Sequence, residues 1–268
     1  MVNLSKESLA IKRSIVSMCH KAGSSHVASG LSCADLLAVL YFGGFLRVDP
    51  KKPNWEERDY FILSKGHASA ALYATLAHAG FFPVAELEKY YQDGSKMPGH
   101  PIRGSLPGVE ASTGSLGHGL GLGAGMALAL HMDGKQNRIF VLMSDGELDE
   151  GSVWEAILFA GARKLSNLVA IIDFNKLQSF GRVKEVLDLE PLEDKLRSFG
   201  WEVGRVNGNS TDSIAALLSS KFLSSKKPKV IIADTIKGHG VSYMQDRLEW
   251  HYKSTSQTEY EKAMKELR

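Results

Sequence analysis

Cysteine is scarce in this sequence: Cys19 and Cys33 are its two cysteines among 268 residues. They form no Cys-x-x-Cys pair, so the pattern predicts neither a disulfide framework nor a thiolate metal site. So few cysteines, expected as free thiols, are typical of a reducing compartment, and we expect a cytoplasmic protein. In keeping with this, residues 1–12 lack the apolar segment of a secretory signal peptide.

Long apolar runs and an excess of one charge are also missing. The most apolar stretch, residues 34–46, is too short to span a bilayer and contains Gly43 and Gly44. The 32 basic and 30 acidic residues give a formal net charge of +2, and they form no basic stripe. We therefore expect neither a membrane nor nucleic acid as a partner.

The apolar pattern predicts a single α/β domain over residues 1–268. Short apolar runs typical of buried parallel strands alternate with segments of helical periodicity, without repeats or linker-like stretches. This alternation predicts a doubly wound, mostly parallel sheet with helices on both faces. The expected strands are 60–63, 139–143, 168–172, 230–233 and a less apolar one at 202–206. The expected helices are 6–22, 32–42, 69–79, 115–131, 151–164, 191–199, 211–222 and about 257–267.

Small and polar residues follow four of these strands. Ligands of open α/β sheets bind at the carboxyl ends of the strands, so we expect the four clusters to line one edge of the sheet. The clusters are Ser64–His67, Ser144–Glu147, Asp173–Asn175 and Lys237–Gly240.

Two of these clusters hold residues that suit a metal ion. Asp145 follows one strand, and Asn175 ends the next, 30 residues later. Carboxylate and amide oxygens suit Mg²⁺ rather than zinc, and Mg²⁺ takes further ligands from water and phosphate. Gly146 would let a diphosphate approach the backbone before the next helix. On spacing alone, an alternative stays open in which Asp145 caps the helix at 151–164 and Asn175 makes a turn.

The wider pattern resembles the thiamine diphosphate signature, Gly-Asp-Gly followed by Asn about thirty residues later, and is most similar to the transketolases. Ser144 stands at the first Gly position, where serine fits if its φ stays negative, so we expect binding to be retained. His118 stands where many transketolases carry Gln. The resemblance covers residues 5 to about 255. Its further motifs are Ser25-His26, Gly66-His67, Pro98-Gly99-His100-Pro101, Thr113–Gly117 and Trp250-His251.

The resemblance implies a thiamine diphosphate-binding fold and a role for each residue at this edge. The metal, Mg²⁺ with Ca²⁺ or Mn²⁺ as substitutes, would be bound by Asp145, Asn175 and the backbone carbonyl of Leu177. Thiamine diphosphate would be bound by His67, Gly114, Leu116, Asp145, Gly146, Glu147, Asn175 and Lys237. The catalytic residues would be His26, His67, His100 and His251. Of these, His26 and His100 would face the reacting carbon and the sugar donor, and His251 would line the mouth of the site. Each of these histidines also has a structural interpretation, in a loop, a cap or packing.

Two other features are not explained by this site. His239 lies between two glycines, and we expect it to be a solvent-facing loop residue. Glu150 matches a glutamate that members of the family use across the subunit interface.

Glycine recurs between residues 114 and 125. Gly117, Gly121 and Gly125 would share one face of a helix, and Gly119 and Gly123 another. Each interior glycine costs about 1 kcal/mol relative to alanine, so we expect another backbone to pack closely against this helix. The resemblance implies that it packs at a subunit interface.

The resemblance also implies a partner. Thiamine enzymes of this kind have a second domain that binds the aminopyrimidine and supplies an activating glutamate, and no room remains for it after the helix expected at about 257–267. We therefore expect that a separate C-terminal subunit supplies it and that two copies of each chain form a heterotetramer. We expect no activity from this chain alone.

The implied reaction is the transfer of a two-carbon ketol unit from a ketose phosphate to an aldose acceptor, as in the pentose phosphate pathway. One alternative is that the chain belongs to another split thiamine diphosphate enzyme, which acts on a modified sugar or a 2-oxo acid. Another is a regulatory half without catalysis. A Mg²⁺-dependent phosphatase with Asp145 as nucleophile would leave the histidines unexplained.

Overall fold

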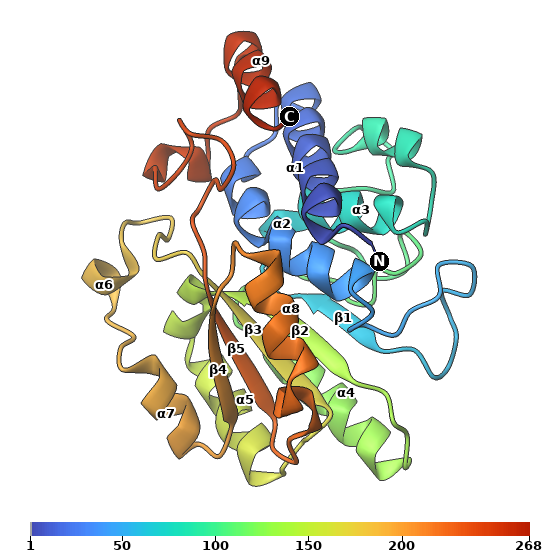
Figure 1. The fold of residues 1–268 in the computed structure, drawn as a ribbon, viewed down its shortest axis with the longest axis vertical. Coiled ribbons are helices and arrows are strands. Elements are labelled where there is room, and N and C mark those ends of the chain that lie inside the picture. Colours follow the sequence, from blue (N-terminus) through green and yellow to red (C-terminus); the bar gives the residue numbers. More distant parts are fainter. Residues whose placement is uncertain (1) are drawn as a thin grey trace.

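The five apolar runs form one parallel sheet with the strand order β1-β2-β3-β5-β4. The structure is a computed structural model, and it describes residues 2–268. Figure 1 shows the sheet with α4, α5 and α7 beside it and α1 to α3 above it. Each predicted strand is confirmed. The strands are β1 (Tyr60–Leu63), β2 (Ile139–Ser144), β3 (Leu168–Phe174), β4 (Glu202–Asn207) and β5 (Lys229–Asp234).

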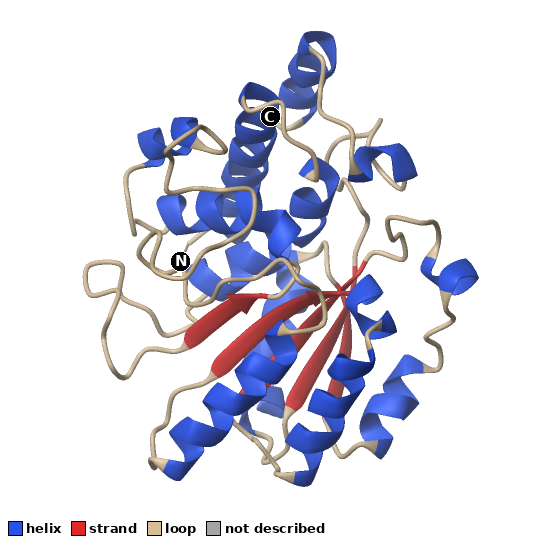
Figure 2. Cartoon of the chain, turned by 180° about the vertical axis from the view of Figure 1, so that it is seen from behind, coloured by secondary structure: helices blue, strands red, loops and turns tan. Residues whose placement is uncertain are grey.

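Two apolar cores form because successive residues of a strand point to opposite faces of the sheet. In β2, Phe140 and Leu142 belong to one core, while Val141 and Met143 belong to the other. The predicted doubly wound fold is therefore confirmed, and both helical layers are visible in Figure 2. The first core includes α1 (Leu4–Lys21), α2 (Val27–Phe42), α3 (Ser69–His78) and α8 (Thr211–Ser219). The second includes α4 (Gly119–Met132), α5 (Gly151–Ala162) and α7 (Leu192–Ser198).

Two further helices lie in the described part of the chain. They are α6 (Val183–Val186), which the sequence did not predict, and α9 (Gln257–Glu266), which it did. The C-terminal segment lies against α1, where the Arg13 side chain donates to the carbonyl of Leu267 at 2.7 Å. Within residues 2–268, no helix is both long and apolar enough to cross a membrane.

Several helix boundaries differ from the prediction. Helix α2 begins at Val27 rather than at 32, directly after His26, whose φ of 67° turns the chain into the helix. Helix α4 begins at Gly119 rather than at 115, because Gly117 adopts a φ of 85° in the preceding loop. The predicted shared face of Gly117 with Gly121 and Gly125 is therefore wrong. The helix expected over 211–222 ends at Ser219, and a short 3₁₀ turn follows it.

The glycines within α4 fall into two groups. A Cβ added to Gly119 or Gly123 would lie 2.2 Å from Ser64 Oγ or 2.5 Å from Val141 Cγ2, so these two let the helix pack closely on the sheet. Gly121 and Gly125 are exposed, and a Cβ there would meet no atom of the described residues within 4 Å. Packing inside the chain thus explains only half of these glycines.

This difference gives a test within one helix. We expect Gly123→Ala to lower the free energy of unfolding by about 1–3 kcal/mol, because Val141 is held rigidly in the sheet. We expect Gly121→Ala to raise it by up to about 1 kcal/mol, since alanine is the better helix former and the space is open. Urea denaturation of the isolated chain measures both. Equal effects of the two substitutions would contradict this assignment of the two groups.

Candidate functional site

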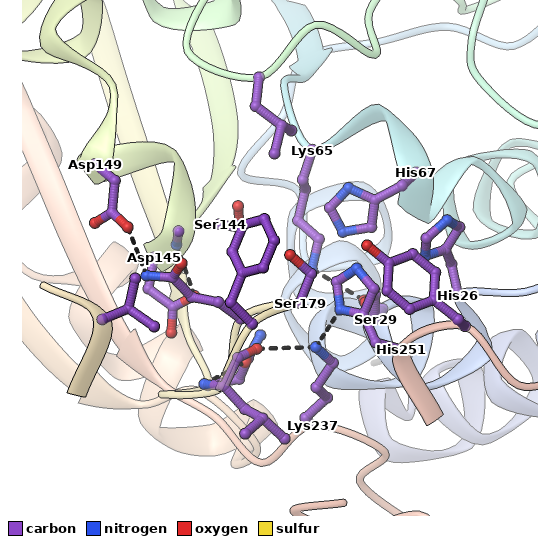
Figure 3. A pocket seen from close by; sticks show the side chains of 18 of the residues that line it. His26, Ser29, Lys65, His67, Ser144, Asp145, Asp149, Ser179, Lys237 and His251 are labelled. Carbon is purple, nitrogen blue, oxygen red and sulfur yellow. Dashed lines mark hydrogen bonds between the residues drawn. The ribbon is translucent and has the colours of Figure 1, made fainter. Parts of the chain in front are cut away.

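A cavity of about 430 Å³ opens where the carboxyl ends of the strands meet. This volume lies in the range of about 300–1,000 Å³ that is typical of small-molecule sites. All four predicted clusters contribute to its wall, and Figure 3 shows several of these side chains converging. The predicted site residues that line it are His26, His67, His100, Gly114, Leu116, Asp145, Gly146, Asn175, Leu177, Lys237 and His251.

Asp145 and Asn175 lie side by side in this wall. The register of β2 and β3 pairs Ser144 with Asp173, so the residues that follow both strands are neighbours. The Asp145 carboxylate accepts the backbone N–H of Lys176 at 2.5 Å. The structural alternative was that Asp145 caps helix α5. The residue that precedes this helix is Glu150, so Asp145 does not cap it.

The oxygen atoms at this point fit a divalent ion. Burial, and then the nearby Asp173, raises the pKa of Asp145 to about 7, so a cation beside this carboxylate would be stabilising. Asn175 Oδ1 accepts the N–H of Leu177 at 3.1 Å, and the Leu177 carbonyl accepts the Lys237 ammonium at 2.8 Å. A carboxylate, an amide and a carbonyl oxygen are hard ligands that suit Mg²⁺. In the described part of the chain, no three His, Cys, Asp or Glu residues form a metal-binding group.

A buried ion pair lies beneath the cavity. Lys65 and Asp173 are both fully buried, and their side chains meet at 2.5 Å. Burial opposes the charge of Lys65, but Asp173 outweighs it and raises the pKa of this lysine. Asp173 also accepts hydrogen bonds from the hydroxyls of Ser32 and Thr235, and Lys65 donates to the Ser29 carbonyl at 3.0 Å. The pair as a whole is neutral, but of its two members only Lys65 lines the cavity, so the cationic end faces the space where an anion would bind.

Three histidines gather on the other side of this lysine. The ring centroids of His26, His67 and His251 lie 5.1–5.7 Å apart. Figure 3 shows the three side chains grouped together. Burial is the main cause that lowers the pKa of His26 to about 4 and of His251 to about 3, and it lowers the pKa of His67 as well. All three are therefore neutral at pH 7. The Lys237 ammonium lies 2.6 Å from His251 Nδ1, so this nitrogen accepts and the ring carries its proton on Nε2.

Two buried polar atoms of the wall have no partner among residues 2–268. They are Nδ1 of His26 and Oδ1 of Asp149, and both residues line the cavity. Buried polar atoms are nearly always hydrogen-bonded in native proteins. A bound ligand or water would satisfy them.

Close backbone packing brings the remaining predicted residues to the cavity. A Cβ on Gly66 would lie 2.8 Å from the backbone nitrogen of Gly114, so both glycines allow this contact next to His67. Gly114 has a φ of 150°, and a Cβ there would lie 3.0 Å from the ring of His100. The loop that carries Leu116 is thereby held between the two histidines.

Glu147 does not line the cavity, contrary to the predicted contact with the cofactor. Its buried carboxylate accepts the N–H of Ser144 at 2.9 Å, that of Gly117 at 3.1 Å and the hydroxyl of Ser64. The spacing Ser144-x-x-Glu147 is a capping box, a signal in the sequence that points to this structural role. Ser144 itself has a φ of −89°, so the expectation that serine fits there is confirmed.

Several residues of the wall had no predicted role. Gln178 donates to Asp149 at 2.8 Å, and Ser29 lies beside the ion pair. Phe180 and Tyr252 line the cavity although they are 84% and 64% exposed. Large exposed apolar groups beside a cavity are typical of a surface that another molecule covers.

The ion pair can be tested through stability. We expect Lys65→Met to lower the free energy of unfolding by about 3–5 kcal/mol, because Asp173 would stay buried without its cation. The control is Lys176→Met, which removes a half-exposed partner of Asp234 and should cost about 0–1 kcal/mol. Urea denaturation compares the two. A cost of less than about 1 kcal/mol for Lys65→Met would show that this pair does not hold the site together.

Comparison with known proteins agrees with this geometry. Residues 6–267 match the family described as "Transketolase, thiamine diphosphate binding domain". The chain is 40% identical to the 6-deoxy-6-sulfo-D-fructose transketolase subunit SqwG of Clostridium sp. (strain MSTE9), over 99% of this chain and 96% of that protein. It is 43% identical to one of the subunits of the apulose-4-phosphate transketolase of Actinobacillus succinogenes, with the same coverage of 99% and 96%.

A solved structure shows the same fold. Transketolase from Leishmania mexicana superposes with a TM-score of 0.92 and 28% sequence identity. The match covers 100% of this chain but 41% of that one. The chain thus corresponds to one part of a longer transketolase.

Proposed function

Because the chain belongs to the transketolase family and matches its thiamine diphosphate-binding domain, we propose that it is the N-terminal subunit of a two-chain transketolase. It binds Mg²⁺ and the diphosphate of thiamine diphosphate. The enzyme transfers a two-carbon ketol unit from a ketose phosphate to an aldose acceptor. We place it in the cytoplasm, because both of its cysteines are buried thiols.

The observation that carries this proposal is the pairing of Asp145 with Asn175 in the wall of one cavity. In the proposed complex these two side chains and the Leu177 carbonyl bind the metal, and Lys237, now bonded to that carbonyl, binds the diphosphate instead. Lys65 adds a second positive charge. Thiamine diphosphate, when bound, supplies the chemistry that holds the two-carbon unit between donor and acceptor.

The histidines serve proton transfer and recognition of the sugar. The rings of His26, His67 and His251 are neutral at pH 7 and lie together at the cavity, so each has one accepting and one donating nitrogen. In His251 the accepting Nδ1 is taken by Lys237, so this ring offers the Nε2 proton. The free Nδ1 of His26 is available to a substrate hydroxyl. His100 is exposed at the rim and meets the substrate from the opposite loop.

A second chain completes the site. Helices α4 and α5 pack against each other and expose large apolar side chains, Leu122 on α4 and Leu158 and Phe159 on α5, besides the exposed glycines of α4. Exposed apolar groups of this kind are suited to burial against another protein chain. The partner carries the pyrimidine-binding domain and the activating glutamate, and two copies of each chain form a heterotetramer. That similar proteins of the same length are named as subunits supports this arrangement.

A second candidate is a transketolase for a modified sugar. Two similar proteins are named for 6-deoxy-6-sulfo-D-fructose and apulose 4-phosphate, and both match over nearly their whole length. The mouth of the cavity is aromatic rather than charged at Phe180 and Tyr252. The donor's anionic end is therefore bound mainly by the partner chain, in either candidate.

Cofactor binding is the first test. We expect Asp145→Ala to raise the dissociation constant of thiamine diphosphate at least about 100-fold in the presence of Mg²⁺, since the metal loses its only carboxylate ligand. Chelation of the metal should act in the same way. The control Asp133→Ala, at the exposed end of α4, should leave binding unchanged. Titration calorimetry would count against the proposal if the wild type released no heat or if both variants bound alike.

The need for a partner is the second test. We expect the purified chain to transfer no ketol unit from ketose phosphates, because the proposed partner supplies the activating glutamate. Glu150, the glutamate that lines the cavity of the described chain, is expected to act across the subunit interface instead. Mixing with the partner chain should restore activity in a coupled assay of aldose consumption. Turnover by this chain alone would refute the two-chain proposal.

A further inference from the structure

His239 is not the solvent-facing loop residue that its neighbouring glycines predicted. Its Nδ1 lies 3.1 Å from a carboxylate oxygen of Asp35 and 3.0 Å from the ammonium of Lys12. Asp35 is buried in helix α2, and Lys12 reaches it from α1 with two contacts of 2.8 and 2.9 Å. His239 is therefore tied to a buried ion pair outside the cofactor cavity.

Asp35 is the centre of this cluster. Besides Lys12 and His239, it accepts the hydroxyl of Ser8 at 2.5 Å and the amide of Asn209 at 3.1 Å. Burial alone would raise the pKa of this carboxyl, but the hydrogen bond from His239 and the charge of Lys12 hold it at about 2. Asp35 is thus a charged acceptor at neutral pH, with partners from separate parts of the chain.

The cluster fixes the segment that carries Lys237. Asn209 accepts the N–H of Ile236 at 2.7 Å, while its amide group donates to Asp35. The N–H of Gly238 donates to the carbonyl of Ala28, on the same helix as Asp35, at 3.0 Å. Residues 236–239 are therefore held against α2 on both sides of Lys237, whose side chain leaves between these points towards the cavity.

We propose that Asp35, acting through His239 and Asn209, is a positioning residue that holds Lys237 at the cofactor site. Lys237 is buried, and its ammonium meets both the Leu177 carbonyl and His251. A long lysine side chain reaches such a point reproducibly only if its backbone is fixed. Neither Asp35 nor His239 lines the cofactor cavity, so their effect reaches it through the backbone of this segment. The inference rests on the proposed function for the role of Lys237.

The first measurement needs no cofactor. His239 borders an open cavity, so His239→Ala creates no closed void and should fold. We expect hydrogen exchange at the amides of Ile236 and Gly238 to become about tenfold faster in this variant, as local opening costs less. His239→Asn, whose amide nitrogen replaces Nδ1, should restore slow exchange. The control is His78→Ala, a similarly half-buried histidine bonded to Ser14, which should have no effect at these amides.

The second measurement is a double-mutant cycle on thiamine diphosphate binding with Mg²⁺. We expect His239→Ala to raise the dissociation constant about five- to tenfold, and to add nothing when Lys237 is already methionine. His78→Ala should change neither the binding nor the cycle.

The outcomes separate the two proposals. Unchanged exchange in His239→Ala overturns the positioning role, whatever the cofactor does. The positioning role is also overturned if His239→Ala lowers the affinity equally in the wild type and in Lys237→Met. It is overturned as well if Lys237→Met itself causes no loss of affinity. In both cases His239 would not act through this lysine. A wild-type chain that binds no thiamine diphosphate even when mixed with its partner refutes the proposed function instead, and the exchange result still decides whether the cluster anchors the segment.

Discussion

The parallel register between β2 and β3 is the constraint on which the site depends. It pairs Ser144 with Asp173, so that Asp145, which follows β2, lies beside Asn175, which follows β3. Asp145 and Asn175 owe their common place in the cavity wall to this pairing, although 30 residues separate them. Because side chains alternate along a strand, a shift of one residue would turn Asp173 into the opposite core and separate it from Lys65.

Charge balance is the second requirement at this edge. Asp145 and Asp173 are both buried, but only Asp173 has a lysine as its direct partner. Burial, and then the charge of Asp173, raises the pKa of Asp145, and no directly paired lysine offsets this rise. One part of the site, the ion pair of Lys65 and Asp173, is therefore balanced in charge within the chain. The other part, at Asp145 and Asn175, is balanced only when a cation binds. Such a division lets the empty chain fold while leaving free energy available for the metal and its anionic cofactor.

The strands could be predicted from the sequence because strands covered on both faces are continuous apolar runs. The location of the site could be predicted because the polar residues that follow parallel strands share one edge of the sheet. The first residue of α2 could not be predicted from the sequence, because residues 27–40 are buried on every side of the helix and show no amphipathic periodicity. Glu147 and Asp145 are acids of one turn, and the capping-box spacing Ser144-x-x-Glu147 was the signal that separates their roles. The tertiary partners Ser64 and Gly117, which complete the burial of Glu147, could not be read from the sequence. His239 was misjudged for the same reason, since its partner Asp35 lies 204 residues away.

The proposed site requires that one divalent ion binds between Asp145 and Asn175. The decisive measurement is a crystal structure of the chain soaked with thiamine diphosphate and Mn²⁺, with anomalous diffraction data. We expect one manganese peak within bonding distance of the Asp145 carboxylate, the Asn175 amide oxygen and the Leu177 carbonyl, with Lys237 moved off that carbonyl. A manganese peak elsewhere, or a bound cofactor with Lys237 still bonded to Leu177, would contradict it.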